Sequence, residues 1–160
     1  MNELTSLAAE VIELLKAKNK TLSTAESCTG GMIGAAITSV PGASEVYGFG
    51  FITYANEAKE KILGVKHETL AAHGAVSPET AEEMAAGALR VSGADIAVAV
   101  TGIAGPGGGT PEKPVGLVYM GLATEKYVRA IRLNLSGSRD QVRLDTCLGA
   151  LDIVRIALTY

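Results

Sequence analysis

The chain has 160 residues, enough for one domain with a sizeable core, and nearly half of them are apolar, which argues against an intrinsically disordered protein. Fourteen basic against seventeen acidic residues give a formal net charge of −3 without a long run of either sign, so binding to nucleic acid is not expected. The N-terminus carries no signal-peptide pattern and no apolar run approaches a bilayer span, so we expect a cytoplasmic protein that does not bind membranes.

Cysteines and histidines are few. Cys28 and Cys147 match no metal-ligand or redox spacing, which predicts two reduced thiols. His67 and His73 do not form a zinc-binding HExxH pattern, and no other set of residues resembles a metal cage. The sequence therefore predicts a protein that uses neither a metal nor another cofactor.

The first half of the chain alternates between helix and strand patterns. Helices are expected where apolar residues recur every three to four positions, and strands where β-branched and aromatic residues cluster. In chain order these patterns predict a helix over 5–18, a strand over 21–25, a helix over 29–40, a strand over 46–54 and short helices over 56–63 and 68–73. Asn56 is the expected cap of the helix over 56–63.

The second half begins with a clear helix start, in which Ser77 is the expected cap and Pro78 the first helical residue. A near-continuous apolar run is typical of a strand that is buried on both faces, and a loop rich in Gly and Pro follows it. The patterns predict a helix over 80–91, a strand over 95–100, a loop over 102–114, a hairpin of strands over 115–123 and 127–135, and a long helix over 138–158.

This order of elements predicts the fold class. Alternating helices and strands followed by a hairpin indicate an α/β/α sandwich, in which helices cover both faces of a mixed sheet. No linker, repeat or low-complexity tract interrupts the chain, so residues 1–160 are expected to form one domain.

The segment AESCTGG, residues 25–31, lies at a predicted strand-to-helix junction. Backbone N–H groups at a helix start stabilise negative charge, so the amides of Cys28 to Gly31 could hold the oxyanion formed when Ser27 attacks a carbonyl. Gly30 and Gly31 would let a substrate approach the backbone closely. Alternatively, Ser27 or Thr29 only caps the helix and the glycines serve close packing.

A serine nucleophile needs a base. His67 and His73 lie in a polar stretch between helices, where neither is well placed for this role. Lys59 lies near the start of a helix that follows a strand, from which it could reach a neighbouring loop, and a lysine with a lowered pKa can serve as a base. Alternatively, Lys59 belongs to a solvated helix face with Glu57 and Lys61.

The loop TGIAGPGGG, residues 101–109, follows the buried strand. Ligands bind at the carboxyl ends of strands in open α/β sheets, so this loop is a candidate substrate-binding segment, although a solvent loop is the alternative. It matches neither a phosphate-binding Walker loop nor a dinucleotide-binding fingerprint. The candidate binding residues in it are Thr101, Gly102, Ala104 and Gly105.

Two arginines lie one turn apart at the start of the last predicted helix. Arg139 and Arg143 could hold a phosphate there, since guanidinium groups and helix N-termini both bind anions. Alternatively, they pair with Asp140 or Asp145 on the surface.

Taken together, six segments resemble the CinA carboxy-terminal domain family, whose stand-alone members are nicotinamide-nucleotide amidases of the PncC type. The segments follow the family's order and span nearly the whole chain. They are AESCTGG (25–31), FITY with NEAK (51–54 and 56–59), HGAVS (73–77), TGIAGPGGG (101–109), EKPVG (112–116) and SGSRDQVR (136–143).

The resemblance implies an α/β sandwich that hydrolyses nicotinamide mononucleotide (NMN) to nicotinate mononucleotide and ammonia in pyridine nucleotide (NAD) salvage, without a metal. It implies that Ser27 is the nucleophile, that Lys59 is the general base, and that Tyr54 orients groups or relays protons. Cys28, Thr29, Gly30 and Gly31 would then line the oxyanion site, and the loop over 101–109 would enclose the ribose and ring. Arg139 and Arg143 would bind the 5′-phosphate.

The family also implies self-association into a homo-oligomer. Its longer members carry an additional amino-terminal domain, which the short stretch before Ala25 predicts to be absent here. Two alternatives remain: a nucleotide-binding module without catalysis, and a partner protein of the competence and damage responses.

Overall fold

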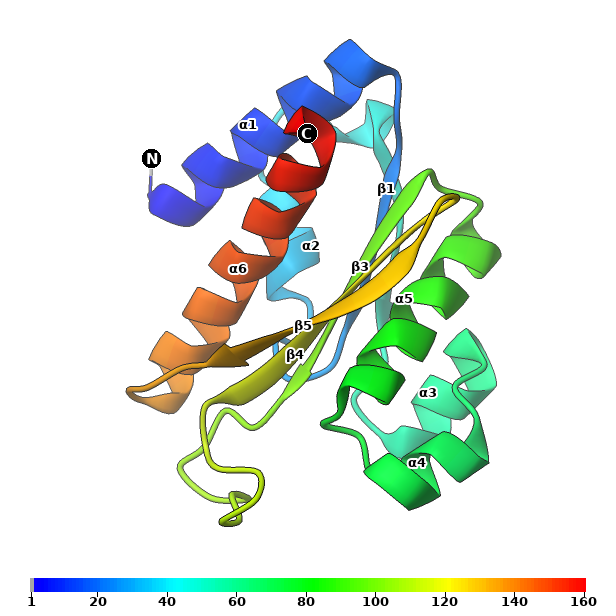
Figure 1. Cartoon of the computed structure of the whole chain (residues 1–160). Coiled ribbons are helices and arrows are strands. Elements are labelled where there is room, and N and C mark those ends of the chain that lie inside the picture. The colour runs from blue at the N-terminus through cyan, green and yellow to red at the C-terminus, as the bar shows by residue number, and fades with distance from the viewer. Residues whose placement is uncertain (1) are drawn as a thin grey trace.

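The computed structural model describes residues 2–160 as a five-stranded sheet between two layers of helices (Figure 1). The helices are α1 (Glu3–Lys18), α2 (Met32–Thr38), α3 (Asn56–Leu63), α4 (His67–His73), α5 (Pro78–Ser92) and α6 (Arg139–Thr159), with a 3-10 turn, η1, at Ala43–Glu45. The strands are β1 (Leu22–Glu26), β2 (Tyr47–Ile52), β3 (Ile96–Gly102), β4 (Leu117–Thr124) and β5 (Val128–Asn134).

The sheet is mixed, with the strand order β2-β1-β3-β4-β5. Strands β2, β1 and β3 are parallel, whereas β4 and β5 form the expected hairpin and pair antiparallel with β3 and with each other. Helices α1, α2 and α6 cover one face, and α3, α4 and α5 cover the other (Figure 1). The expected α/β/α sandwich is confirmed.

The two faces of the sheet differ in side-chain size. In β3, Ile96, Val98 and Val100 pack toward α1, α2 and α6, and the alternate residues Ala97 and Ala99 pack toward α5. These small residues let α5 lie close to the sheet. Helix α5 therefore packs directly on the strands that lead to the predicted site, and α3 and α4 pack on α5.

Contacts between helices fix α3 as well. A Cβ at Gly87 of α5 would lie 1.9 Å from the carbonyl oxygen of Leu63, the last residue of α3, so the two backbones meet at a point where only glycine fits. Arg90 donates a hydrogen bond of 3.0 Å to the same carbonyl. Helix α3, which carries Lys59, is thus anchored to α5 at its carboxyl end.

Helices α1, α5 and α6 begin at a side-chain cap, whereas α2, α3 and α4 do not. Ser77 caps α5 by accepting a hydrogen bond from Thr80 N, and Pro78 opens that helix, as predicted. The prediction that Asn56 caps its helix is wrong, because Asn56 is already the first helical residue and Ala55 occupies the cap position without a side-chain bond. Helix α2 is shorter than the expected 29–40, because residues before Met32 form a turn in which Gly30 and Gly31 have φ angles of 57° and 106°.

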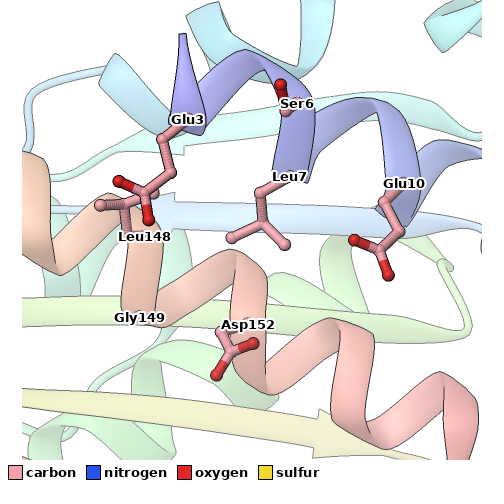
Figure 2. Close-up of a pocket in the computed structure, with 7 residues that line it drawn as sticks. All are labelled: Glu3, Ser6, Leu7, Glu10, Leu148, Gly149 and Asp152. Atoms are coloured by element: carbon pink, nitrogen blue, oxygen red, sulfur yellow. The ribbon is translucent and has the colours of Figure 1, made fainter.

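A cavity of about 530 Å³ lies between α1 and α6 (Figure 2). These two helices lie on the face of the sheet opposite α5 (Figure 1). It is lined by Glu3, Ser6, Leu7, Glu10, Leu148, Gly149 and Asp152. Its ionisable side chains are all acidic, and no basic group lies in the lining to activate the hydroxyl of Ser6. Of the helices in residues 2–160, none combines the length and apolar composition that a membrane crossing requires.

Candidate active site

The carboxyl ends of the parallel strands β2, β1 and β3 meet at one edge of the sheet. The segments that follow these three strand ends line a cavity of about 280 Å³. It is smaller than the cavity between α1 and α6, but the predicted motifs form its walls. The residues that line this cavity, hereafter the pocket, are Ser27, Cys28, Tyr54, Asn56, Lys59, Ala75, Val76, Thr101, Gly102, Ile103, Ala104, Gly105, Gly107, Gly108 and Arg139.

Ser27 and Lys59 meet at the base of this pocket. The Nζ of Lys59 lies 3.2 Å from the Oγ of Ser27, and it also donates to the carbonyl oxygens of Thr53 at 2.9 Å and Tyr54 at 3.2 Å. Only 1% of the Lys59 surface and 8% of the Ser27 surface is exposed. The lysine is therefore held by three neutral oxygens in a nearly dry environment, and the alternative of a solvated helix face is wrong.

The electrostatics of Lys59 favour its neutral form. Across residues 2–160, no carboxylate lies within ion-pair distance of its ammonium group. Burial lowers the pKa of Lys59, and the opposing influence of the Cys28 thiol is smaller. A lysine amine with a lowered pKa beside a serine hydroxyl is the arrangement that can remove the hydroxyl proton.

Cys28 lies beside Ser27 in the pocket and is the obvious competitor as a nucleophile. Its thiol is buried, and this burial raises its pKa to about 11. Burial likewise raises the pKa of Cys147, in α6, to about 12. Since the thiolate is the reactive form, the protonated Cys28 thiol is a poor nucleophile at neutral pH.

Three of the five amides of the turn over residues 27–31 already have partners, and the first is the N–H of Ser27, which donates to the carbonyl of Val100. The N–H of Gly30 donates to the carbonyl of Ser27, and the N–H of Gly31 donates to the carboxylate of Glu26. For the amides of Cys28 and Thr29 no partner exists within residues 2–160. Of the four predicted oxyanion donors, Cys28 and Thr29 are thus the two whose N–H groups are free, and of these only Cys28 lines the pocket.

Arg143 supports this turn from outside the pocket. Its Nε donates to the carbonyl of Cys28 at 3.0 Å and its Nη2 to the carbonyl of Thr29 at 3.1 Å. Neither Arg143 nor Thr29, Gly30 and Gly31 belong to the pocket lining. These four predicted substrate-binding residues therefore stand behind the pocket wall rather than on it.

Arg139 and Tyr54 lie at the rim. Arg139 donates to the carbonyl of Gly105 at 2.8 Å and to the hydroxyl of Tyr54 at 3.3 Å, which links α6 to the loop over 101–109. The Tyr54 side chain is 62% exposed, and it is the backbone carbonyl of Tyr54 that contacts Lys59. The ring hydroxyl of Tyr54 is thus placed to meet a bound molecule at the pocket entrance.

The loop over 101–109 forms one wall of the pocket, and Thr101, Gly102, Ala104 and Gly105 all line it. The Thr101 hydroxyl donates to the carbonyl of Ala75 at 2.8 Å, which joins this wall to the segment before α5. Sequence reasoning assigned no individual site role to six lining residues, although each lies inside a segment quoted for the family resemblance. They are Asn56, Ala75, Val76, Ile103, Gly107 and Gly108.

The pocket lining contains basic side chains and no acidic ones. The basic side chains are Lys59 and Arg139, and no carboxylate lines the pocket. Across the described residues 2–160, no three His, Cys, Asp or Glu side chains cluster closely enough to hold a metal ion. The arrangement combines a serine, a buried amine, the free backbone N–H of Cys28 and an arginine in a pocket that suits an anionic small molecule.

Sequence comparisons match the chain to known proteins over nearly its full length. The model of the CinA C-terminal domain matches residues 4–158. A protein of Caldanaerobacter subterraneus that bears the provisional name competence-damage inducible protein is 57% identical over 91% of this chain, and a CinA-like protein of Kosmotoga olearia is 53% identical over 96%. The chain spans little more than a third of these relatives, 35% and 37% of their lengths.

Solved structures agree with the sequence comparison. The competence/damage inducible protein CihA from Agrobacterium tumefaciens superposes with a TM-score of 0.95 at 46% identity, covering 100% of this chain and 98% of that one. A CinA superfamily protein from Klebsiella pneumoniae superposes with a TM-score of 0.95 at 35% identity, covering 99% of both chains. The chain therefore belongs to the CinA C-terminal domain family.

Proposed function

We propose that this protein is an amidase that hydrolyses the carboxamide of nicotinamide mononucleotide, with Ser27 as nucleophile and Lys59 as general base. One observation carries the proposal: the Nζ of Lys59, buried and without a carboxylate partner in residues 2–160, lies 3.2 Å from the Oγ of Ser27. Burying a lysine without an ion-pair partner lowers the stability of a fold, and groups with perturbed pKa values cluster at functional sites, which makes Lys59 a candidate for function.

The first half of the reaction is acyl transfer. The Oγ of Ser27 attacks the carboxamide carbon while the neutral Lys59 amine takes the hydroxyl proton. Negative charge develops on the former carbonyl oxygen, which the N–H of Cys28 stabilises. Lys59 then returns the proton to the amide nitrogen, the C–N bond breaks, and ammonia leaves.

The second half restores the enzyme. The nicotinoyl group is now an ester of Ser27, and neutral Lys59 takes a proton from a water molecule that attacks the ester carbon. When this intermediate collapses, the C–O bond to Ser27 breaks and Lys59 protonates the departing Oγ. The sum is one amide and one water converted to one carboxylic acid and one ammonia.

The choice of substrate draws on the charge of the pocket and on the family. Arg139, at the rim, is the basic group that can meet a phosphate while Lys59 stays at the base with the carboxamide. A phosphate contact from a guanidinium is charge-assisted and stronger than a neutral hydrogen bond. The pocket supports an anionic nucleotide as the substrate, and the choice of NMN among such nucleotides rests on the resemblance to the CinA family.

The experiment is a turnover assay of the purified protein with NMN. We expect ammonia and nicotinate mononucleotide in equal amounts, and slower turnover of the nicotinamide riboside, which lacks the phosphate. Ser44→Ala serves as a control for the serine variant because Ser44 is exposed in η1, away from the pocket. Saturable binding of NMN without ammonia release would reject the amidase and favour a nucleotide-binding module.

A further inference from the structure

Glu26 is a buried acid that the chemistry of Ser27 and Lys59 does not use. It is the last residue of β1, directly before the nucleophile, and pairs with Ile52 of β2 and Val100 of β3 on either side. Only 2% of its surface is exposed. A carboxylate in such a place is destabilising unless hydrogen bonds meet its charge.

Four donors meet this carboxylate, and all of them follow it within eight residues. Its Oε1 accepts from the Thr29 hydroxyl and from the N–H groups of Gly31, at 3.2 Å, and Ile33, at 3.0 Å. Its Oε2 accepts from the N–H of Gly34 at 3.0 Å. Within residues 2–160 it forms no ion pair. The backbone at the start of α2 thus holds the charge of Glu26, and Lys59 does not.

Arg143 holds the same turn from its other side, through the carbonyls of Cys28 and Thr29. Over residues 28–34, the Glu26 carboxylate therefore binds three N–H groups and the Arg143 guanidinium binds two C=O groups. Because peptide planes are rigid, fixing both sets of groups fixes the direction in which the Ser27 side chain leaves the chain. The Glu26 carboxylate accepts from the N–H groups of Gly31, Ile33 and Gly34, whereas the N–H of Cys28 has no partner within residues 2–160.

We propose that Glu26 is a positioning residue of the site, an inference that rests on the amidase function above. Its carboxylate holds the turn over residues 27–31 in the conformation that keeps the Oγ of Ser27 at the Nζ of Lys59 and the N–H of Cys28 open to the oxyanion. Glu26 lies outside the pocket lining, so it acts on the geometry of the reacting groups and not on substrate affinity.

The first test is Glu26→Gln, which keeps the shape of the side chain but replaces one acceptor oxygen by an amide nitrogen. That nitrogen must face one of the four donors, so the turn loosens. We expect kcat to fall by about ten- to a hundredfold, the size of effect that a misplacement of about 1 Å produces, while KM stays near its original value. The matched pair Thr29→Val and Thr29→Ser tests the hydroxyl contact: Val lowers kcat and Ser restores it.

Two further measurements separate positioning from a general loss of stability. Leu15→Ala removes a fully buried side chain from the core on the α1 face, so it destabilises the fold without touching the turn. We expect it to leave kcat unchanged at a temperature where the protein is folded. The pH at which the rate of Glu26→Gln reaches half its maximum should not move, because Glu26 does not pair with Lys59.

The proposal would be overturned by an unchanged kcat in Glu26→Gln, by a loss of kcat that Leu15→Ala reproduces, or by an effect confined to KM. A shift of the pH midpoint would also overturn it, since Glu26 would then act through the charge of Lys59. If the wild-type protein hydrolyses no amide, the proposed function fails, and hydrogen exchange decides the role of Glu26 alone. Faster exchange over residues 27–34 in Glu26→Gln than in Leu15→Ala supports positioning, and equal exchange rejects it.

Discussion

The Nζ of Lys59 lies 3.2 Å from the Oγ of Ser27, although the two residues are 32 positions apart in the sequence. Parallel pairing of β1 and β2 brings their carboxyl ends to one edge of the sheet, and α3 begins four residues after β2 ends. Contact between Gly87 and Leu63 then fixes α3 on α5. Close packing between the backbones of α3 and α5 thus helps to place the buried amine of Lys59 beside Ser27.

Ser27→Ala should abolish turnover while the fold and NMN binding stay largely intact. The variant removes the atom that attacks, and loss of a serine nucleophile in a hydrolase typically lowers kcat by roughly 10⁴- to 10⁶-fold. The measurement is ammonia release together with a titration of NMN binding. Turnover above a few per cent of the Ser44→Ala control would show that another group attacks the amide.

Lys59→Arg should be nearly inactive, because a guanidinium stays protonated and cannot accept the proton of Ser27. Loss of a general base costs about 10²- to 10⁴-fold. Lys61→Arg is the matched control, since Lys61 is exposed on the same helix. In the wild type, the rate should rise with pH as Lys59 loses its proton, because burial lowers its pKa. Near-normal turnover in Lys59→Arg would mean that the positive charge matters and proton transfer does not.

The lowered pKa of Lys59 should also make the free energy of unfolding depend on pH. Its pKa in the folded chain is below the ordinary value of 10.5, so between these two values the unfolded chain binds more protons. The ionisation of Lys59 therefore contributes a free energy of unfolding that rises with pH through this window, by at most about 1.4 kcal/mol per pH unit.

Lys59→Met lacks that ionisation. The free energy of unfolding of the wild type minus that of Lys59→Met, from urea titrations at a series of pH values, should increase toward alkaline pH. A difference that stays constant or falls with pH would contradict a lowered pKa.

Cys28 should be dispensable for chemistry. At a pKa of about 11, roughly one thiol in 10⁴ is ionised at neutral pH, so iodoacetamide should modify it slowly in the folded protein. We expect Cys28→Ala to retain most of its turnover, because the backbone N–H that serves the oxyanion remains. Inactivation by the reagent at the rate of its reaction with Cys28, together with an inactive Cys28→Ala, would make the thiol the nucleophile.

Substitution of Arg139 and substitution of Arg143 should have different effects on the use of NMN and of its riboside. Arg139→Ala removes the basic group at the rim, so use of NMN should fall by about ten- to a hundredfold, equivalent to about 1.5–3 kcal/mol, while the poor use of the riboside barely changes. Arg143→Ala removes the support of the Cys28 and Thr29 carbonyls, so kcat should fall on both substrates. Equal losses on both substrates for Arg139→Ala would reject its phosphate role.

Local sequence signals predicted the architecture well, because the sheet and its caps follow from short-range chemistry. The apolar run of β3 indicated a strand buried on both faces, and Ser77 with Pro78 marked the start of α5. Segment order and the hairpin then left few arrangements other than a mixed sheet between two helical layers.

The contacts around the nucleophile could not be predicted in this way. Glu26 looks like any residue at the end of a strand. Only the fold shows that its carboxylate takes the N–H of Gly31, one of the four amides that the sequence assigned to an oxyanion, together with those of Ile33 and Gly34. Arg143 contacts the turn across more than 110 positions of the sequence, and no local pattern encodes that contact. The burial of Lys59 likewise depends on packing between α3 and α5.

A double-mutant cycle on Ser27 and Lys59 tests the central claim most directly. Groups that act as one catalytic unit are strongly non-additive, since the first substitution already removes what the second would remove. We predict that Ser27→Ala with Lys59→Met together hydrolyse NMN no more slowly than the slower single variant. Losses in kcat/KM that multiply in the double variant would show that the two residues act independently and would contradict the serine–lysine dyad.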